Sequence, residues 1–222
     1  DAGAVTLAAI LSTAAGNTLE NGATFSVGTT LGNAEGTDFT QNVTTLSFAA
    51  GSGQGASPTT DLSITPMADA QVEGDETPTF TLAVTGGGAG RGSQASHALT
   101  ITDADTATVG FTLATSTRGE DGGAVTLAAT LSTAAGNTLE NGATFSVGTT
   151  LGNAEGADFT ANVVSLSFAA GSGQGASPTT ELIVTPTADV LVEGDETPTF
   201  TLSVSGGAAG LGSQASHALT IT

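Results

Sequence analysis

The sequence predicts an all-β protein made of two tandem seven-stranded immunoglobulin-like antiparallel β-sandwiches, the first copy lacking its first strand. Three observations predict this fold. Residues 1–102 (the first repeat) align without a gap on residues 121–222 (the second repeat), with 16 differences, and such self-similarity is typical of arrays of folding units. Short runs rich in Val, Thr, Leu and Phe alternate apolar and polar positions, and glycine-rich turns separate them. No stretch of ten residues has helical spacing.

The alternation predicts six strands in the first repeat, near Ala4–Leu11, Ala23–Thr30, Val43–Phe48, Thr59–Thr65, Thr77–Thr85 and Ala95–Thr102. A seventh strand, near Val109–Leu113, precedes the second repeat and has no counterpart ahead of Asp1. Seven strands are the number in an immunoglobulin-like sandwich. Since each repeat has the usual size of a domain, we expect two domains, at residues 1–105 and 106–222.

The composition limits the classes of partner. The chain has 21 acidic residues against two arginines, a formal net charge of -19, so it repels nucleic acids and anionic membranes. Disorder is not expected, because only 10% of the residues are charged and 38% are hydrophobic. No apolar stretch approaches the roughly 18 residues of a membrane span. Asp1-Ala2-Gly3 has no signal character, so we expect any export signal to be missing or already removed.

The acidic residues fall into a few loops of each repeat. If successive strands reverse direction, one end of the sandwich receives the loop with Glu35 and Asp38, the loop from Asp69 to Glu76, and the exit segment with Asp103 and Asp105. Close carboxylates repel one another strongly. A hard divalent cation relieves this repulsion, and Ca²⁺ fits best because it takes six to eight oxygen ligands from flexible loops. Mg²⁺ needs stricter geometry, and Zn²⁺ prefers Cys or His.

These motifs resemble the Calx-beta family. The likeness depends on Gly36-Thr-Asp-Phe-Thr40, Leu46-Ser-Phe-Ala-Ala-Gly51, Ala68-Asp-Ala-Gln-Val-Glu-Gly-Asp-Glu76 and Leu99-Thr-Ile-Thr-Asp-Ala-Asp105, most of which recur in the second repeat. The resemblance implies Ca²⁺ ligands at Asp38, Asp69, Glu73, Glu76, Asp103 and Asp105, and at Glu120, Asp158, Asp189, Glu193 and Glu196. The chain departs from the family pattern where Ala68, Ala104 and Ala188 replace acids and where Phe39 and Phe159 replace a tyrosine.

Other interpretations of single motifs are weaker. His97 and His217 follow serines inside a predicted strand without the nucleophile elbow of a hydrolase, so a structural role is expected. A glycosidase would need aromatic platforms, and the chain has no Trp or Tyr. The glycine runs lack the Gly-Lys-Ser/Thr of a phosphate loop. The sequence therefore predicts a protein that is not an enzyme.

We expect a calcium-binding, non-catalytic extender module of a large bacterial secreted or cell-surface adhesin, with neighbouring repeats of the same protein as its partners. Strand parity predicts domains stacked head to tail, with calcium stiffening the acidic loops and the joint. Two alternatives stay open. An unfilled sheet edge in the first repeat would allow fibre assembly with like chains by strand donation. Threonine-rich faces, such as that with Thr6, Thr24 and Thr100, would suit a polysaccharide- or ice-binding module.

Overall fold

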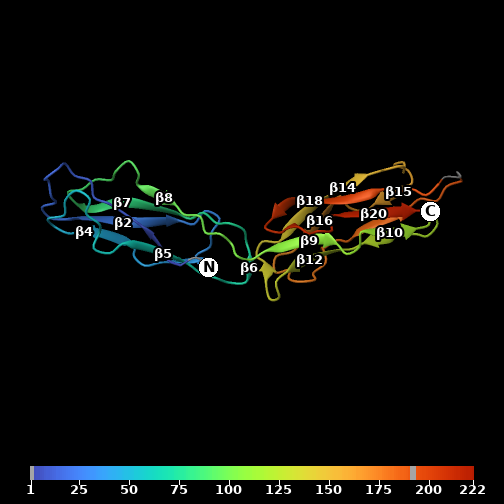
Figure 1. Ribbon diagram of the computed structural model, residues 1–222, viewed down its shortest axis with the longest axis horizontal. Helices are drawn as coiled ribbons and strands as arrows, with labels where there is room; N and C mark the ends of the chain where they lie inside the picture. Colours follow the sequence, from blue (N-terminus) through green and yellow to red (C-terminus); the bar gives the residue numbers. More distant parts are fainter. Residues whose placement is uncertain (1–2, 191–193) are drawn as a thin grey trace. The chain divides into compact units, whose positions relative to one another are not determined.

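The computed structural model describes residues 3–190 and 194–222, and the described residues form strands and turns (Figure 1). The predicted all-β fold is confirmed. No helix in these ranges is long and apolar enough to cross a membrane. Contacts divide the chain into two compact units: Asp1–Asp69 with Asp75–Thr102, and Ala70–Gly74 with Asp103–Thr222. The expected boundary between residues 105 and 106 stays a prediction about independent folding.

The first unit has two antiparallel sheets, ordered β1-β5-β3 and β4-β2-β7-β8. Its strands are β1 (Val5–Leu7), β2 (Ala23–Thr30), β3 (Phe39–Gln41), β4 (Thr45–Phe48), β5 (Leu62–Pro66), β7 (Thr79–Gly87) and β8 (Ser96–Ala98). Apolar side chains from both sheets, among them Val27, Ile64 and Phe80, pack together in the core. The alternating pattern of the sequence therefore places one face of each sheet inside, as expected for a sandwich.

The second unit has a five-stranded sheet, β10-β20-β18-β14-β16, and two three-stranded sheets, β11-β17-β15 and β12-β9-β19; β6 pairs with β13. The strands are β6 (Gln71–Val72), β9 (Ala107–Phe111), β10 (Thr115–Arg118), β11 (Val125–Leu127), β12 (Ala129–Thr133), β13 (Thr138–Leu139), β14 (Ala143–Thr150), β15 (Phe159–Ala161), β16 (Ser165–Phe168), β17 (Leu182–Pro186), β18 (Thr199–Gly207), β19 (Gly210–Leu211) and β20 (Ser216–Ile221). One continuous core joins them.

In the second unit the chain passes from one sheet to another at three places: between β9 and β10, between β11 and β12, and between β15 and β16. Strands β14, β17, β18 and β20 each lie in one sheet. The pairing is not wholly antiparallel, because β10–β20, β9–β19 and β6–β13 are parallel. The first and last of seven successively reversing segments run in the same direction, which is why β10 and β20 form a parallel pair where they lie side by side.

The same six residues form strands of different length in the two units. Ser-His-Ala-Leu-Thr-Ile is a complete strand, β20, in the second unit, but only its first three residues form β8 in the first. Residues 9–13 likewise form no strand, although their counterparts form β12. In the second unit, β9 and β10 supply the pairing partners of these segments. The neighbouring strand thus decides how far each ladder extends.

Candidate metal centre

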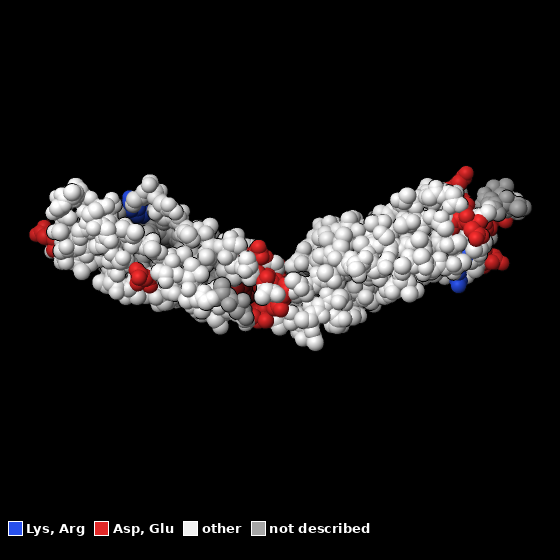
Figure 2. All heavy atoms as spheres, in the orientation of Figure 1, with Lys and Arg blue, Asp and Glu red and all other residues white. Residues whose placement is uncertain are grey.

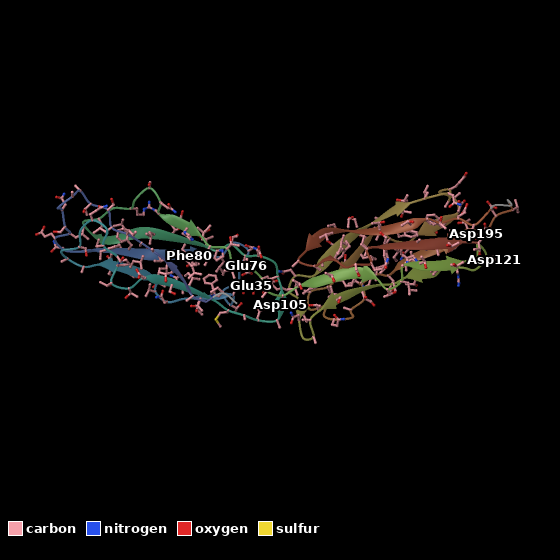
Figure 3. All side chains as sticks on the ribbon, viewed as in Figure 1. Glu35, Glu76, Phe80, Asp105, Asp121 and Asp195 are labelled. Carbon is pink, nitrogen blue, oxygen red and sulfur yellow. The ribbon has the colours of Figure 1, made fainter. Side chains whose placement is uncertain are left out.

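Acidic side chains gather at one end of the first unit and at the end of the second unit that carries the C-terminus (Figure 2). Figure 3 labels Glu35 and Glu76 at that end of the first unit, with Phe80 further into its core. It also labels Asp121 and Asp195 at one end of the second unit, whereas Asp105 lies at its other end. Each unit therefore has a strongly acidic pole formed by loops.

The loop ahead of β3 presents Asp38. Its backbone amide bonds to the carbonyl of Glu35 at 3.4 Å, and its Oδ2 accepts a hydrogen bond from the amide of Glu35. Next in the chain, Phe39 is buried and packs edge-on against Phe80, with ring centroids 5.7 Å apart. This anchor holds Asp38 against the sandwich, where the aspartate is only 5% exposed. The aspartate is therefore pre-positioned and partly removed from water.

A second carboxylate of the first unit lies beside Asp38. One ligand oxygen each from Asp38 and Asp69 can be chosen so that the two lie within 4.8 Å of each other. Asp38 is buried and Asp69 is exposed, while Glu73, which belongs to the second unit, is half-buried. At such separations, two like charges repel by about 3 kcal/mol at an effective dielectric constant near 20, and by less where water screens them. Two carboxylate oxygens at this spacing have the chemistry to hold a hard cation.

The loop that carries Glu73 and Glu76 is held by an asparagine that the sequence analysis did not single out. Asn33 donates from Nδ2 to the carbonyl of Asp75 (2.9 Å), and its Oδ1 accepts from the amide of Thr77 (3.0 Å). Glu76 pairs through its backbone with Ile101 in both directions at 2.9 Å, and its side chain is 4% exposed. Asn33 follows a glycine in a turn, and this Gly-Asn pair recurs at residues 152–153; the recurrence was the available signal.

Asp103 holds the earlier part of the same loop, at residues 73–74. Its Oδ2 accepts hydrogen bonds from the amides of Glu73 (2.8 Å) and Gly74 (3.0 Å), and its Oδ1 accepts from the amide of Asp105 (2.7 Å). Asp105 in turn accepts a hydrogen bond from the side chain of Asn137. A carboxylate oxygen has two lone pairs, so these bonds orient Asp103 and still leave acceptor capacity. The structure thus joins Asp103 and Asp105 in one hydrogen-bonded network with the backbone of residues 73–74.

The second repeat reproduces the same loop frame. The Oδ2 of Asp158 accepts from the amide of Glu155, and Glu196 is 6% exposed with its backbone paired to Ile221. Asn153 repeats the clamp of Asn33, with a 2.7 Å bond to the carbonyl of Asp195 and a 2.9 Å bond from the amide of Thr197.

The other predicted ligands of the second repeat are less fully placed. The amide of Glu120 bonds to the carbonyl of Thr222 at 3.1 Å, which ties the entry of this repeat to its last strand. Asp189 is exposed. Glu193 lies outside the described residues. A close carboxylate pair equivalent to Asp38 and Asp69 is therefore described only for the first repeat.

His217 has the structural role that the sequence predicts. Its side chain is 3% exposed, its Nε2 lies 2.7 Å from the hydroxyl of Ser116, and its Nδ1 lies 2.8 Å from the carbonyl of Leu113. Its ring also packs against Phe111, with centroids 5.7 Å apart. These partners occupy both ring nitrogens. His97, at the matching position of the first repeat, is exposed.

No protein-family model matches the sequence, and no curated protein matches it. Among solved structures, the apo-form Calx CBD1 domain aligns at 20% identity over 52% of this chain and 96% of that chain, with a TM-score of 0.43. The calcium binding domain CBD12 of CALX1.1 aligns at 15% identity over 98% and 93%, with a TM-score of 0.37. Chicken VE-cadherin EC1-2 aligns at 13% identity over 100% and 91%, with a TM-score of 0.32. Because these TM-scores are below 0.5, the proposals below depend on the residues of the chain.

Proposed function

We propose that the chain is a calcium-binding, non-catalytic structural module of the Calx-beta type, an extender within a larger secreted or cell-surface protein. The observation that carries this proposal is the approach of the Asp38 and Asp69 carboxylates to within 4.8 Å of each other. In a chain with 21 acidic residues and two arginines, an external cation is the natural counter-charge.

The donor set suits Ca²⁺ better than other common metals. Both close donors are carboxylate oxygens on loops, and carboxylates bind Ca²⁺ through one or two oxygens. Further oxygen donors would be Glu73 and Glu76 in the first repeat and Asp103 and Asp105 directly after it. In the second repeat the corresponding donors would be Asp158, Asp189, Glu193 and Glu196, with Glu120 ahead of them. Zn²⁺ is disfavoured because the close donors include neither Cys nor His.

A bound Ca²⁺ would supply positive charge that removes the repulsion among these carboxylates. The loops would then be fixed by metal–oxygen bonds as well as by Asn33 and Asp103, and successive repeats of an array would be stiffened. The neighbouring repeats of the same protein are the proposed partners. Extracellular modules of this kind bind with dissociation constants on the order of 10⁻⁴ to 10⁻³ M, which extracellular calcium near millimolar is sufficient to populate.

Calorimetric titration with CaCl₂ tests the proposal directly, with MgCl₂ as the comparison metal. At 10 mM Ca²⁺, dissociation constants in that range correspond to about 1.4 to 2.7 kcal/mol of added stability, so the melting temperature should rise and should fall again in chelator. Asp69→Asn should weaken uptake. Asp75→Asn is the matched control, because Asp75 is an exposed acid of the same loop whose backbone carbonyl, and not its side chain, accepts from Asn33. Equal loss in both variants, or no calcium uptake, would refute the proposal.

A further inference from the structure

The first unit has an open groove of about 770 Å³ along the edge of β8. It is lined by residues 6–13, 88–92 and 94–97, and its floor is apolar, formed by Leu7, Ala9, Leu11, Phe25, Phe80 and Leu82. The side chains of Leu7, Ala9 and Leu82 are half-buried. Because apolar surface of this kind is stabilised by removal from water, the groove is a surface that favours a partner.

The second unit shows what covers the same surface. There, β9 runs antiparallel to β12, with Val109 opposite Leu131, and parallel to β19, with Val109 opposite Leu211. The side chains of Ala107, Val109 and Phe111 all point into the core, and Val109 is 0% exposed. Beneath this strand, the residues that match the groove floor are closed off: Leu127 and Ala129 are each 1% exposed and Leu202 is 2% exposed. A strand of alternating apolar residues therefore fits this surface.

The backbone groups that hold β9 have identical counterparts in the first repeat. The amide of Phe111 bonds to the carbonyl of Gln214 at 2.8 Å, the amide of Thr112 to Ala128 at 2.8 Å, and the amide of Gly212 to the carbonyl of Val109 at 2.8 Å. The corresponding residues of the first repeat are Gln94, Ala8 and Gly92. All three are exposed, so the same hydrogen bonds are available to an incoming strand.

The two histidines differ in exposure because the groove is covered in the second unit and open in the first. His217 is buried under the segment from Phe111 to Ser116, whereas His97 is exposed and lines the groove. The chain contains only these two histidines. Their ring signals therefore distinguish a covered groove from an open one within a single molecule.

We propose that the groove of the first unit binds an extended β-strand with the chemistry of residues 107–118, small or apolar side chains at alternate positions followed by Thr-Ser-Thr. The strand would run antiparallel to residues 9–13 and parallel to residues 90–91, then parallel to residues 98–101, as β9 and β10 do in the second unit. This is recognition by strand addition, in which main-chain bonds give affinity and alternate side chains give specificity. The interaction does not depend on calcium.

The test uses the 222-residue chain and a synthetic peptide of residues 104–118, followed by NMR of the histidine rings. The ring signals of His97 should move saturably toward the positions of those of His217, while the signals of His217 stay fixed. A Val109→Asp peptide should bind at least about tenfold more weakly, because it would bury a charge. A Leu113→Asp peptide should bind within about twofold of the original, because Leu113 is 61% exposed in the second unit. Unmoved His97 signals at millimolar peptide would overturn the proposal.

A second variant avoids dependence on peptide solubility. Residues 107–120 are placed directly ahead of Asp1, which repeats the connection that precedes Asp121. The first unit should then unfold at higher temperature, His97 should be protected, and added peptide should have no further effect. An unchanged melting temperature with His97 still exposed would count against the groove. A dimer of the unmodified chain with protected His97 would show that a second copy fills it, and would also overturn the proposal.

Discussion

Truncation of one leucine in each unit measures how much the open groove weakens the first sandwich. Leu202 is 2% exposed, whereas Leu82, at the matching position, is half-buried in the groove. Leu202→Ala removes transfer free energy and leaves a closed cavity, so it should cost about 3 kcal/mol. Leu82→Ala leaves no closed cavity and removes a side chain that already meets water, so it should cost about 1 kcal/mol.

The difference of about 2 kcal/mol corresponds to roughly a thirtyfold change in the ratio of folded to unfolded protein. Urea unfolding followed through the ring signals of His97 and His217 measures each unit separately. Val84→Ala and Val204→Ala are the matched controls, since these side chains are 46% and 47% exposed, and both should cost little and equally. The explanation fails if the two leucine variants lose the same free energy within about 0.5 kcal/mol.

Three further substitutions test the local geometry of the second unit. Gly207 has φ 85°, and an added Cβ would lie 2.3 Å from the carbonyl oxygen of Gly142. Gly207→Ala should therefore destabilise the protein by more than about 2 kcal/mol, which is the upper limit for a left-handed residue without such a clash. Gly175→Ala, at φ 80° in open space, should cost only about 1 kcal/mol, and thermal melting compares the two. Asn153→Ala should cost about 1 to 2 kcal/mol and accelerate amide exchange at residues 195–197; unchanged exchange there would contradict the proposed clamp.

The sequence predicts the side-chain pattern of the sandwiches well, because alternation directly determines which face is buried. Strand ends are predicted less well. The strand expected near Val43–Phe48 is present as β4, but β3, on the other side of Asn42, was not predicted. Asn42 donates to the carbonyl of Asp61 (2.9 Å) and accepts from the amide of Ser63 (2.7 Å). This side chain replaces ladder bonds where the backbone changes sheets, a feature set by tertiary partners and invisible to periodicity.

The arrangement of the acidic loops is likewise predicted only in part. Reversal of successive strands predicts which loops share an end, and the structure brings Asp38 and Asp69 together there. Whether these residues bind calcium stays a prediction. The hydrogen bonds of Asn33 and Asn137 could not be predicted, because an asparagine in a turn has many local partners and only the folded loops select one.

The parallel pair of β10 and β20 has a mechanical consequence. Residues 115–118 lie beside residues 218–221 in matching order, and this ladder is extended by bonds from Ala218 to Ala114 (2.9 Å) and from Thr222 to Arg118 (3.0 Å). Tension applied through the two ends of this segment pair pulls the strands lengthwise past each other, so the bonds share the force and break together. Antiparallel end strands would unzip one bond at a time. We therefore expect the second sandwich to resist stretching better than one with antiparallel end strands would.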